Sequence, residues 1–433
     1  MKFKKAASMI LAGAMVFGLV GCGSSSSANG SKGKSADGIV NLTIWSPTDT
    51  EAIEAWWVEK LNQWNEENPE IQVSREAIDR SDSYAYENKI STATTSNDLP
   101  DILYVDGPNV SYYAVNGLIV PIGSYFSEND IQDFMPCTIQ QGTYDDELYA
   151  LSATESSVAL FYNKDYLDKA HIAYPSDVDI SGAWNWSQFY DNAAKLTTDE
   201  YVGTNIIMDK GEGLIYALGQ FWTVNEAQFV SADGSSAEGY INSEASVETA
   251  EYLAKFIENG YANLDPIKDE FMNGYAATML GGSWNIAVLE ASDINWGVSF
   301  FPVSDSGKAS SPTGDWSAAV TKNCSDVDAA GKFLNWLMTP ENVATYAAAI
   351  AKPASRTSAY DLMEGWDEGP RALMLWQLQN TGTARPSTPS YSVLSNDFAA
   401  AMLNIFTGAD AQAEFDIVAE NFDENFETYY KEK

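Results

Sequence analysis

Residues 40–46, Val-Asn-Leu-Thr-Ile-Trp-Ser, are the stretch on which the interpretation of the fold depends. Apolar and polar residues alternate along it, which predicts a β-strand with one buried face. Thr48 or Thr50 is then a candidate N-cap for a helix, because a threonine hydroxyl accepts a hydrogen bond from a free amide of the first turn. The apolar stripe of this helix consists of Ile53, Trp57, Leu61 and Trp64.

The alternation of strand and helix continues along the next part of the chain. Asn68 ends the first helix, and a second strand over 71–78, a second helix over 84–95 and a third strand over 102–105 follow. Strand, helix, strand, helix, strand is the order of a parallel α/β sheet, which binds ligands beyond the carboxyl ends of its strands. The residues predicted at those ends are Trp45, Ser46, Asp79 to Ser81, and Asp106 to Asn109.

The rest of the chain mixes both kinds of element without an internal repeat. A hairpin is predicted at 144–151 around Asp145 and Asp146. Further strands are predicted at 158–162, 276–280, 296–301 and 317–320, and helices at 398–406 and 411–430. The candidate helix caps are Asn185 with Gln188, Asn242 or Ser243, and Ser325 with Asp328.

The start of the chain has the pattern of an export signal. Lysines precede an apolar run that ends in Leu-Val-Gly-Cys at residues 19–22. This string resembles the lipobox of bacterial lipoproteins, which implies a signal peptide at 1–21, lipid on Cys22 and attachment to the outer face of the cell membrane. The alternative is an uncleaved anchor, but the run is shorter than the roughly 20 residues of a spanning helix. Residues 22–37, rich in Gly and Ser, are predicted to be a flexible tether.

The charge of the chain excludes several partners. It is −37 for the whole sequence and becomes −40 without Lys2, Lys4 and Lys5 of the signal. Such an acidic surface repels phosphate backbones, so we expect no nucleic acid as a partner and no membrane binding through charge. We expect the lipid to make the membrane contact.

Cysteine and histidine are too few for most metal and nucleophile sites. Cys137 and Cys324 remain besides the lipidation site; they form either a disulfide or two buried free thiols. His171 is the single histidine, and we expect it at the surface. A His-rich metal centre and most Ser-His or Cys-His designs are thereby excluded, and we expect no cofactor, no metal and no catalytic residue.

Eight segments, taken in order, resemble the extracellular solute-binding proteins of ATP-binding-cassette transporters, in the sugar-binding branch that includes maltose-binding proteins. The segments are LPDILYVDG at 99–107, ELYALS at 147–152, LFYNKDYL at 160–167, WNWSQFYDNAAKLT at 184–197, MLGGSWN at 279–285, FFPVSDSG at 300–307, TGDWSAAV at 313–320 and RPSTPSY at 385–391. Together they extend over most of the chain.

The resemblance implies an α/β fold of two lobes, joined by a hinge, with the ligand in the cleft between them. The chain length agrees, because roughly 400 residues exceed what one hydrophobic core usually holds. We place the N-terminal lobe at 38–154 plus 303–349. The C-terminal lobe then comprises 155–302 plus 350–433.

Aromatic side chains are the first candidates for the ligand site. The chain holds 13 tryptophans, and a sugar ring presents C–H faces that stack on an indole. Trp284 and Trp316 occupy positions that resemble the family's stacking aromatics, and glycines before Trp284 allow the backbone to approach closely. Trp45, Trp222 and Trp376 are further candidates. For each tryptophan the alternative is a place in the core.

Polar side chains are expected to bind the hydroxyls of the sugar. The candidates are Ser46, Asp106, Glu155, Asn285, Asp315, Arg356 and Tyr391. Asp106 has a helix cap as its alternative, and Arg356, which looks like the family's arginine near the second hinge, has an ordinary salt bridge.

The sequence thus predicts a lipid-anchored, monomeric protein that binds an oligosaccharide by hinge closure and delivers it to a membrane permease. A binding protein for a peptide, polyamine or other small solute is the main alternative, because a fold does not determine its ligand. A surface glycoside hydrolase is a further one, since it needs only two carboxyl groups. The eight strand and helix units of a barrel enzyme are not evident.

Overall fold

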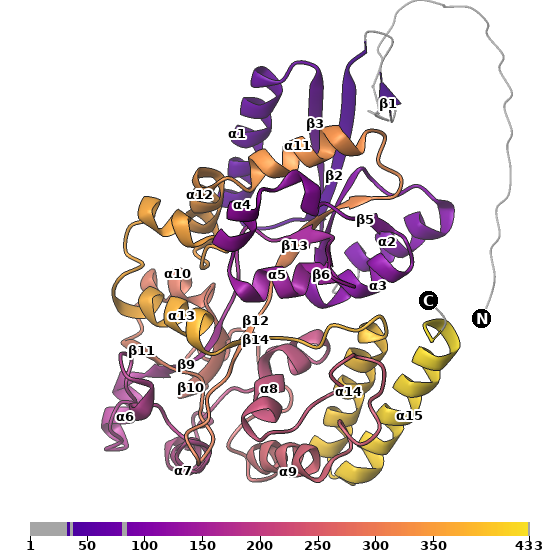
Figure 1. Ribbon diagram of the computed structural model, residues 1–433. Helices are drawn as coiled ribbons and strands as arrows, with labels where there is room; N and C mark the ends of the chain where they lie inside the picture. Colours follow the sequence, from indigo (N-terminus) through magenta and orange to yellow (C-terminus); the bar gives the residue numbers. More distant parts are fainter. Residues whose placement is uncertain (1–32, 35–37, 80–84, 432–433) are drawn as a thin grey trace, which may run out of the picture. The chain divides into compact units, whose positions relative to one another are not determined.

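A computed structural model of the chain describes residues 33–34, 38–79 and 85–431 (Figure 1). The predicted signal peptide 1–21, the lipidation site Cys22 and most of the tether lie outside these residues, as do Arg80 and Ser81. Within the predicted tether, Gly33 and Lys34 form strand β1, antiparallel to the strand that begins at Val40. No helix in the described part of the chain has the length and apolar character to cross a membrane.

Among the described residues, seven strands form one sheet. They are β1 (Gly33–Lys34), β2 (Val40–Pro47), β3 (Ile71–Ile78), β4 (Ile102–Asp106), β5 (Ile119–Val120), β8 (Ala150–Leu151) and β13 (Trp316–Thr321). β2 pairs in parallel with both β3 and β4, which confirms the predicted parallel unit. β13 returns from much later in the chain and pairs with β4 in the antiparallel sense.

Helices connect the parallel strands and cover the sheet. Thr50 caps α1 (Glu51–Glu67), as one of the two predicted caps, and α2 is Ala85–Ser96. Strand β4 is buried on both faces: Ile102 packs into one core cluster and Leu103 into another. Burial on both faces is typical of a parallel strand covered by helices. The polar Asp106 is the last residue of this strand.

A second sheet has the order β10–β9–β11 and packs in a separate core. Its strands are β9 (Val158–Asn163), β10 (Thr278–Gly282) and β11 (Trp296–Ser299). The helices of this core are α7 (Trp186–Leu196), α8 (Glu212–Val224), α9 (Glu244–Glu258), α14 (Tyr391–Phe406) and α15 (Ala411–Tyr429).

The chain crosses between the two sheets more than once. β12 (Ser311–Thr313) and β14 (Gly382–Ala384) pair in parallel there (Figure 1). Isolated bridges join Thr154 to Ala354 and Ser157 to Thr313. Several separate segments that cross between two sheets are what two lobes joined by a hinge require. The residue boundaries of the two lobes stay a prediction.

The remaining helices, strands and 3-10 turns complete the described elements. They are α3 (Val110–Val115), α4 (Glu128–Asp133), α5 (Pro136–Gly142), α6 (Lys164–Lys169), α10 (Asn285–Glu290), α11 (Val327–Leu337), α12 (Pro340–Ile350), α13 (Gly369–Asn380), β6 (Thr143–Tyr144), β7 (Glu147–Leu148) and the 3-10 turns Gly107–Asn109, Gly123–Tyr125, Ile180–Gly182 and Thr357–Leu362.

Local signals were mostly sufficient at the element ends. The capping box of Asn185 is confirmed, and so is the hairpin at Asp145, where β6 pairs with β7. The capping box predicted at Ser325 is wrong, because Asp326 caps α11 instead, its carboxylate accepting from the amide of Ala329 at 3.1 Å.

The two remaining cysteines are free thiols, and the single histidine lies at the surface. Cys137 and Cys324 are free, so the structure does not contain the disulfide that the sequence left open. His171 is exposed, as expected, with a positive φ of 55°.

Candidate functional site

A cavity of about 760 Å³ is bordered by the carboxyl ends of β2 and β4 and by the first turns of α1 and α8. The lining includes these predicted site residues: Ser46, Asp106, Trp284, Asp315 and Trp316. Its volume is in the usual range for a small-molecule site. The carboxyl ends of parallel strands are where an open α/β sheet binds ligands, which explains why the cavity lies here.

Trp284 is the second residue after β10, at the N-cap of α10, and is half-buried. Its ring folds back over Gly282, where a Cβ atom would lie 2.2 Å from the indole carbons. Only glycine therefore permits this position of the indole. On the cavity side Tyr216 stacks on Trp284 at 6.2 Å between ring centroids, so the two rings form one aromatic wall.

Trp316 supplies an indole from the other sheet. It is the first residue of β13, directly opposite Asp106 in the register, and is half-buried. Its ring meets that of Tyr86 edge-on at 5.5 Å. The cavity thus holds one tryptophan from the seven-stranded sheet, Trp316, and one that follows a strand of the second sheet, Trp284.

Arg385 is the central cation of the site, with a side chain only 6% exposed. It forms a bidentate ion pair with Asp106, at 2.8 and 2.6 Å, and also binds Glu212. The hydroxyls of Tyr391 and Ser395 donate to Glu212. Burial raises the pKa of Glu212, and Arg385 opposes that rise. The cluster connects the end of β4 to the first residue of α8.

Two further ion pairs border the cavity. Lys352 Nζ lies 3.1 Å from both oxygens of Asp315, which also accepts from the Thr154 hydroxyl at 2.7 Å. Arg75 binds Glu54 at 2.7 Å, and its Nε donates to the hydroxyl of Ser46 at 2.6 Å. Ser46 and Asp315 are therefore held in fixed orientations.

The charges of the lining determine which ligands it suits. Its cations, Arg75, Lys352 and Arg385, are each paired with a carboxylate. Asp49 and Asp209 add exposed acidic groups. No cation of the described lining is therefore left for an anionic ligand, whereas flat aromatic faces and hydrogen-bonding groups suit a neutral ring.

Glu155 and Tyr391 lie behind the cavity and do not line it. Glu155 is fully buried and accepts from the hydroxyls of Thr138 and Thr313 at 2.7 and 2.9 Å. Burial raises the pKa of Glu155 to about 7, and the nearby Asp315 adds to the rise. Tyr391 contacts the site through its hydrogen bond to Glu212 and through its ring, which lies 6.0 Å from the guanidinium of Arg385.

Five further predicted residues also lie outside the cavity lining. Trp222 is completely buried and packs on Phe398, so the core alternative holds for it. Arg356 is held at 2.9 Å by Asp130 and at 2.6 Å by Asp133, the salt-bridge alternative. The other three, each with its own surroundings, are Trp376 against Phe300, Trp45 under the Lys89 ammonium, and Asn285, which donates to its own turn at Gly282.

Sequence reasoning missed several lining residues, namely Arg75, Glu212, Tyr216, Lys352 and Arg385. Arg385 opens one of the quoted segments, so its place was within reach. Glu212 carried no such signal, because a single acid at the start of a helix is usually explained by the helix dipole. Among the described residues, no group of three or more potential metal-binding side chains is found.

Comparison with known proteins identifies similar chains. The sequence profile of a family described as bacterial extracellular solute-binding protein matches residues 56–372. A galactooligosaccharide-binding protein of Bacillus subtilis is 24% identical over 336 residues, 74% of this chain and 76% of that protein. A maltodextrin-binding protein of the same species is 22% identical over 425 residues, 94% and 91% of the two chains.

Solved structures show the same fold. A cyclic α-maltosyl-1,6-maltose binding protein from Arthrobacter globiformis superposes with a TM-score of 0.75 at 21% identity. The superposition covers 90% of this chain and 100% of that protein. An ABC substrate-binding protein from Listeria monocytogenes in complex with cycloalternan gives 0.76 at 20% identity, covering 89% and 99%. The predicted two-lobed fold, similar to that of maltose-binding proteins, is thereby confirmed.

Proposed function

Because this chain belongs to the bacterial extracellular solute-binding proteins, we propose that it binds a neutral oligosaccharide in the cavity that contains Trp284 and Trp316. The observation that supports this most is a pair of half-buried indoles, one in the seven-stranded sheet and one just after a strand of the second sheet, next to polar groups held in place by ion pairs. One sugar face stacks on each indole, while carboxylates such as Asp106 accept from the hydroxyls.

The ligand also provides the free energy of closure. A sugar that touches both sheets favours the arrangement in which they lie close together, and a partner can then distinguish loaded from empty protein. We propose a membrane permease of an ATP-binding-cassette importer as that partner. The relatives' names, which refer to galactooligosaccharide and maltodextrin, support a saccharide as the cargo.

Attachment to the membrane through lipid on Cys22 completes the proposal. The family is extracellular, and the Leu-Val-Gly-Cys string supports an anchor at the outer face of the membrane. Mass spectrometry of the chain purified from membranes tests this. The mature N-terminus is expected at Cys22 with acyl chains attached, and an unmodified Cys22 contradicts it.

The ligand class is tested by titration of the chain with a panel of compounds while tryptophan fluorescence and heat are followed. Neutral gluco- and galactooligosaccharides are expected to bind. Oligosaccharides of uronic acids are expected to bind more weakly, because each cation of the lining is already paired. If no neutral saccharide binds at about 1 mM, where even weak affinity is measurable, the proposal is wrong. Binding of a peptide or of spermidine in that case identifies the other solute class.

A further inference from the structure

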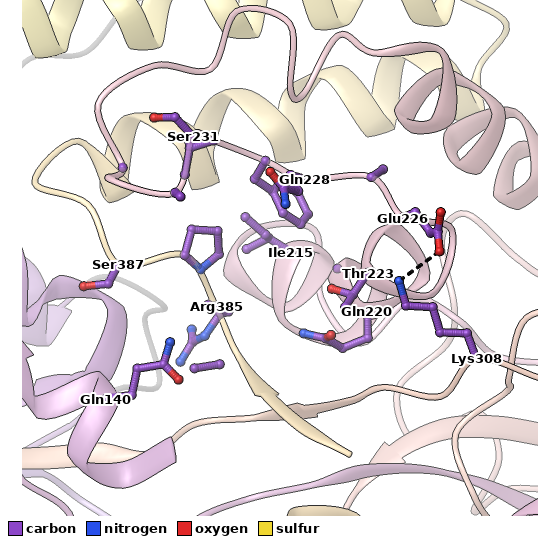
Figure 2. A pocket seen from close by; sticks show the side chains of 18 residues that line it. Gln140, Ile215, Gln220, Thr223, Glu226, Gln228, Ser231, Lys308, Arg385 and Ser387 are labelled. Carbon is purple, nitrogen blue, oxygen red and sulfur yellow. Dashed lines mark ion pairs between the residues drawn. The ribbon is translucent and has the colours of Figure 1, made fainter. Parts of the chain in front are cut away.

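A second cavity, of about 520 Å³, shares one lining residue, Arg385, with the first (Figure 2). Gln140 of α5 lies on one side of it, and Thr223 and Gln228 of the α8 region lie on another (Figure 2). We propose that this second cavity is an accessory binding site for a small neutral polyhydroxy compound of monosaccharide size.

The charges of the second cavity indicate a neutral ligand. Lys308 pairs with Glu226 at 3.6 Å (Figure 2). Arg385 pairs with Asp106 and Glu212. Each charged side chain of the described lining thus has a counter-charge. A charged ligand would have to break one of these pairs, whereas a neutral one would not.

The hydrogen-bonding groups of the cavity match hydroxyl groups. The side chains of Gln140, Thr223 and Gln228 form no hydrogen bond to another described residue, while Gln220 is occupied by Thr383 at 3.1 Å. An amide both donates and accepts, as does a hydroxyl, so these groups can satisfy several hydroxyls of one ring. The apolar part of the lining is Ile215, Phe229 and Pro386, which can cover a C–H face.

Arg385 lines both cavities and has a buried guanidinium. Two of its nitrogens bind carboxylates that belong to the first site, so its charge is already compensated where it borders the second cavity. Its Nε finds no acceptor among the described residues and is enclosed by protein, so it is not counted among the groups that contact the proposed ligand.

A ligand here would contact elements of both cores. α5 packs against β8 of the seven-stranded sheet, whereas α8 packs against α14 and α9. The two cavities share Arg385 and no other described lining residue, so each can be blocked by a substitution elsewhere in its own lining. Failure of one proposal therefore leaves the other standing.

Fluorine NMR with a fluorinated glucose as the probe tests the second site. The 433-residue chain carries Trp284→Ala and Trp316→Ala, so that the first cavity no longer retains the probe. In this background Gln228→Trp fills the second cavity from an exposed position. Val178→Trp, at a position 87% exposed and outside both linings, is the matched control.

Line broadening of the probe is expected to persist in the double variant and when Val178→Trp is added to it. Addition of Gln228→Trp is expected to reduce the broadening roughly tenfold, because the bulky ring blocks the centre of the contact surface. A fluorinated glucuronate is expected to broaden less than the glucose probe. Broadening that disappears already in the double variant, or that Gln228→Trp leaves unchanged while thermal unfolding shows a folded chain, overturns the second site. Stronger broadening of the glucuronate overturns its neutral ligand class.

Discussion

Arg385 and Asp106 form a bidentate ion pair, with Nη1 and Nη2 of the guanidinium 2.8 and 2.6 Å from the two carboxylate oxygens. The two residues are 279 positions apart in the chain, yet both line the first cavity, and Arg385 also lines the second. Asp106 ends a strand of the seven-stranded sheet, and Arg385 directly follows β14. This contact joins the first sheet to the segment that leads into α14.

Arg385→Met is expected to destabilise the protein by about 3–5 kcal/mol, because it leaves the carboxylates of Asp106 and Glu212 without their cation. The midpoint of thermal unfolding measures this. Arg371→Met removes the pair with Glu290, where the two side chains are 24% and 42% exposed, and is the control, with an expected loss below about 1 kcal/mol. Equal effects of the two variants would show that the buried pair has no special role.

Asp106→Asn combined with Arg385→Met is expected to destabilise the protein less than the sum of the two single changes. The double variant leaves Glu212 as the only unpaired group of the cluster, so the two losses overlap. A thermodynamic cycle of the four proteins gives the coupling, expected at about 1–3 kcal/mol for residues in direct contact. A coupling near zero contradicts a direct ion pair.

Trp284→Ala is expected to weaken saccharide binding by about 1 kcal/mol or more, the range of a central aromatic contact. Calorimetric titration measures the affinity. Trp376→Ala is the matched control, since Trp376 is 37% exposed and lies outside the cavity lining. If both variants keep full affinity, Trp284 belongs to the core and the stacking proposal fails.

Gly282→Ala is expected to reduce saccharide affinity as much as Trp284→Ala does. A Cβ atom at this position meets the indole of Trp284 at 2.2 Å, so the ring must move out of its place. Gly123→Ala serves as the comparison, because its Cβ has only an ordinary contact with Leu148 at 3.5 Å. A Gly282→Ala protein with unchanged affinity would mean that the position of the indole does not matter for binding.

Glu155 is expected to make stability depend on pH. Burial raises the pKa of its carboxyl to about 7, above the value of about 4.3 in an unfolded chain. The folded protein therefore binds this proton more tightly, and stability falls as pH rises from about 4.3 through 7, by an amount on the order of 3 kcal/mol.

Glu155→Gln removes that dependence, because the amide has no proton to lose. Thermal unfolding of both proteins at several pH values compares them: the difference in midpoint between variant and wild type is expected to change through this window in favour of the variant at the higher pH. A constant difference shows that the carboxyl does not titrate there.

Local patterns were enough to predict the parallel strands β2, β3 and β4 of the first sheet, but not β1 or β5. Alternation along 40–46 predicted β2, and Thr50 was one of two caps considered for α1. Such signals involve residues a few positions apart, whose geometry the backbone itself dictates. The capping box at Ser325 failed for the same kind of reason: Asp326, one residue on, competes for the same free amides.

The sequence by itself therefore determined the order of elements, the acidic surface and, through the resemblance, the family. Only the tertiary structure decided which tryptophans line the cavity, namely Trp57, Trp284 and Trp316, and that Trp222 is in the core. It also decided that Arg385 lies in the site and pairs with Asp106. Arg356, which the sequence placed in the site, forms a salt bridge with Asp133 outside the cavity lining. The reason is physical: exposure and ion pairing depend on contacts between residues hundreds of positions apart, and no local pattern encodes them.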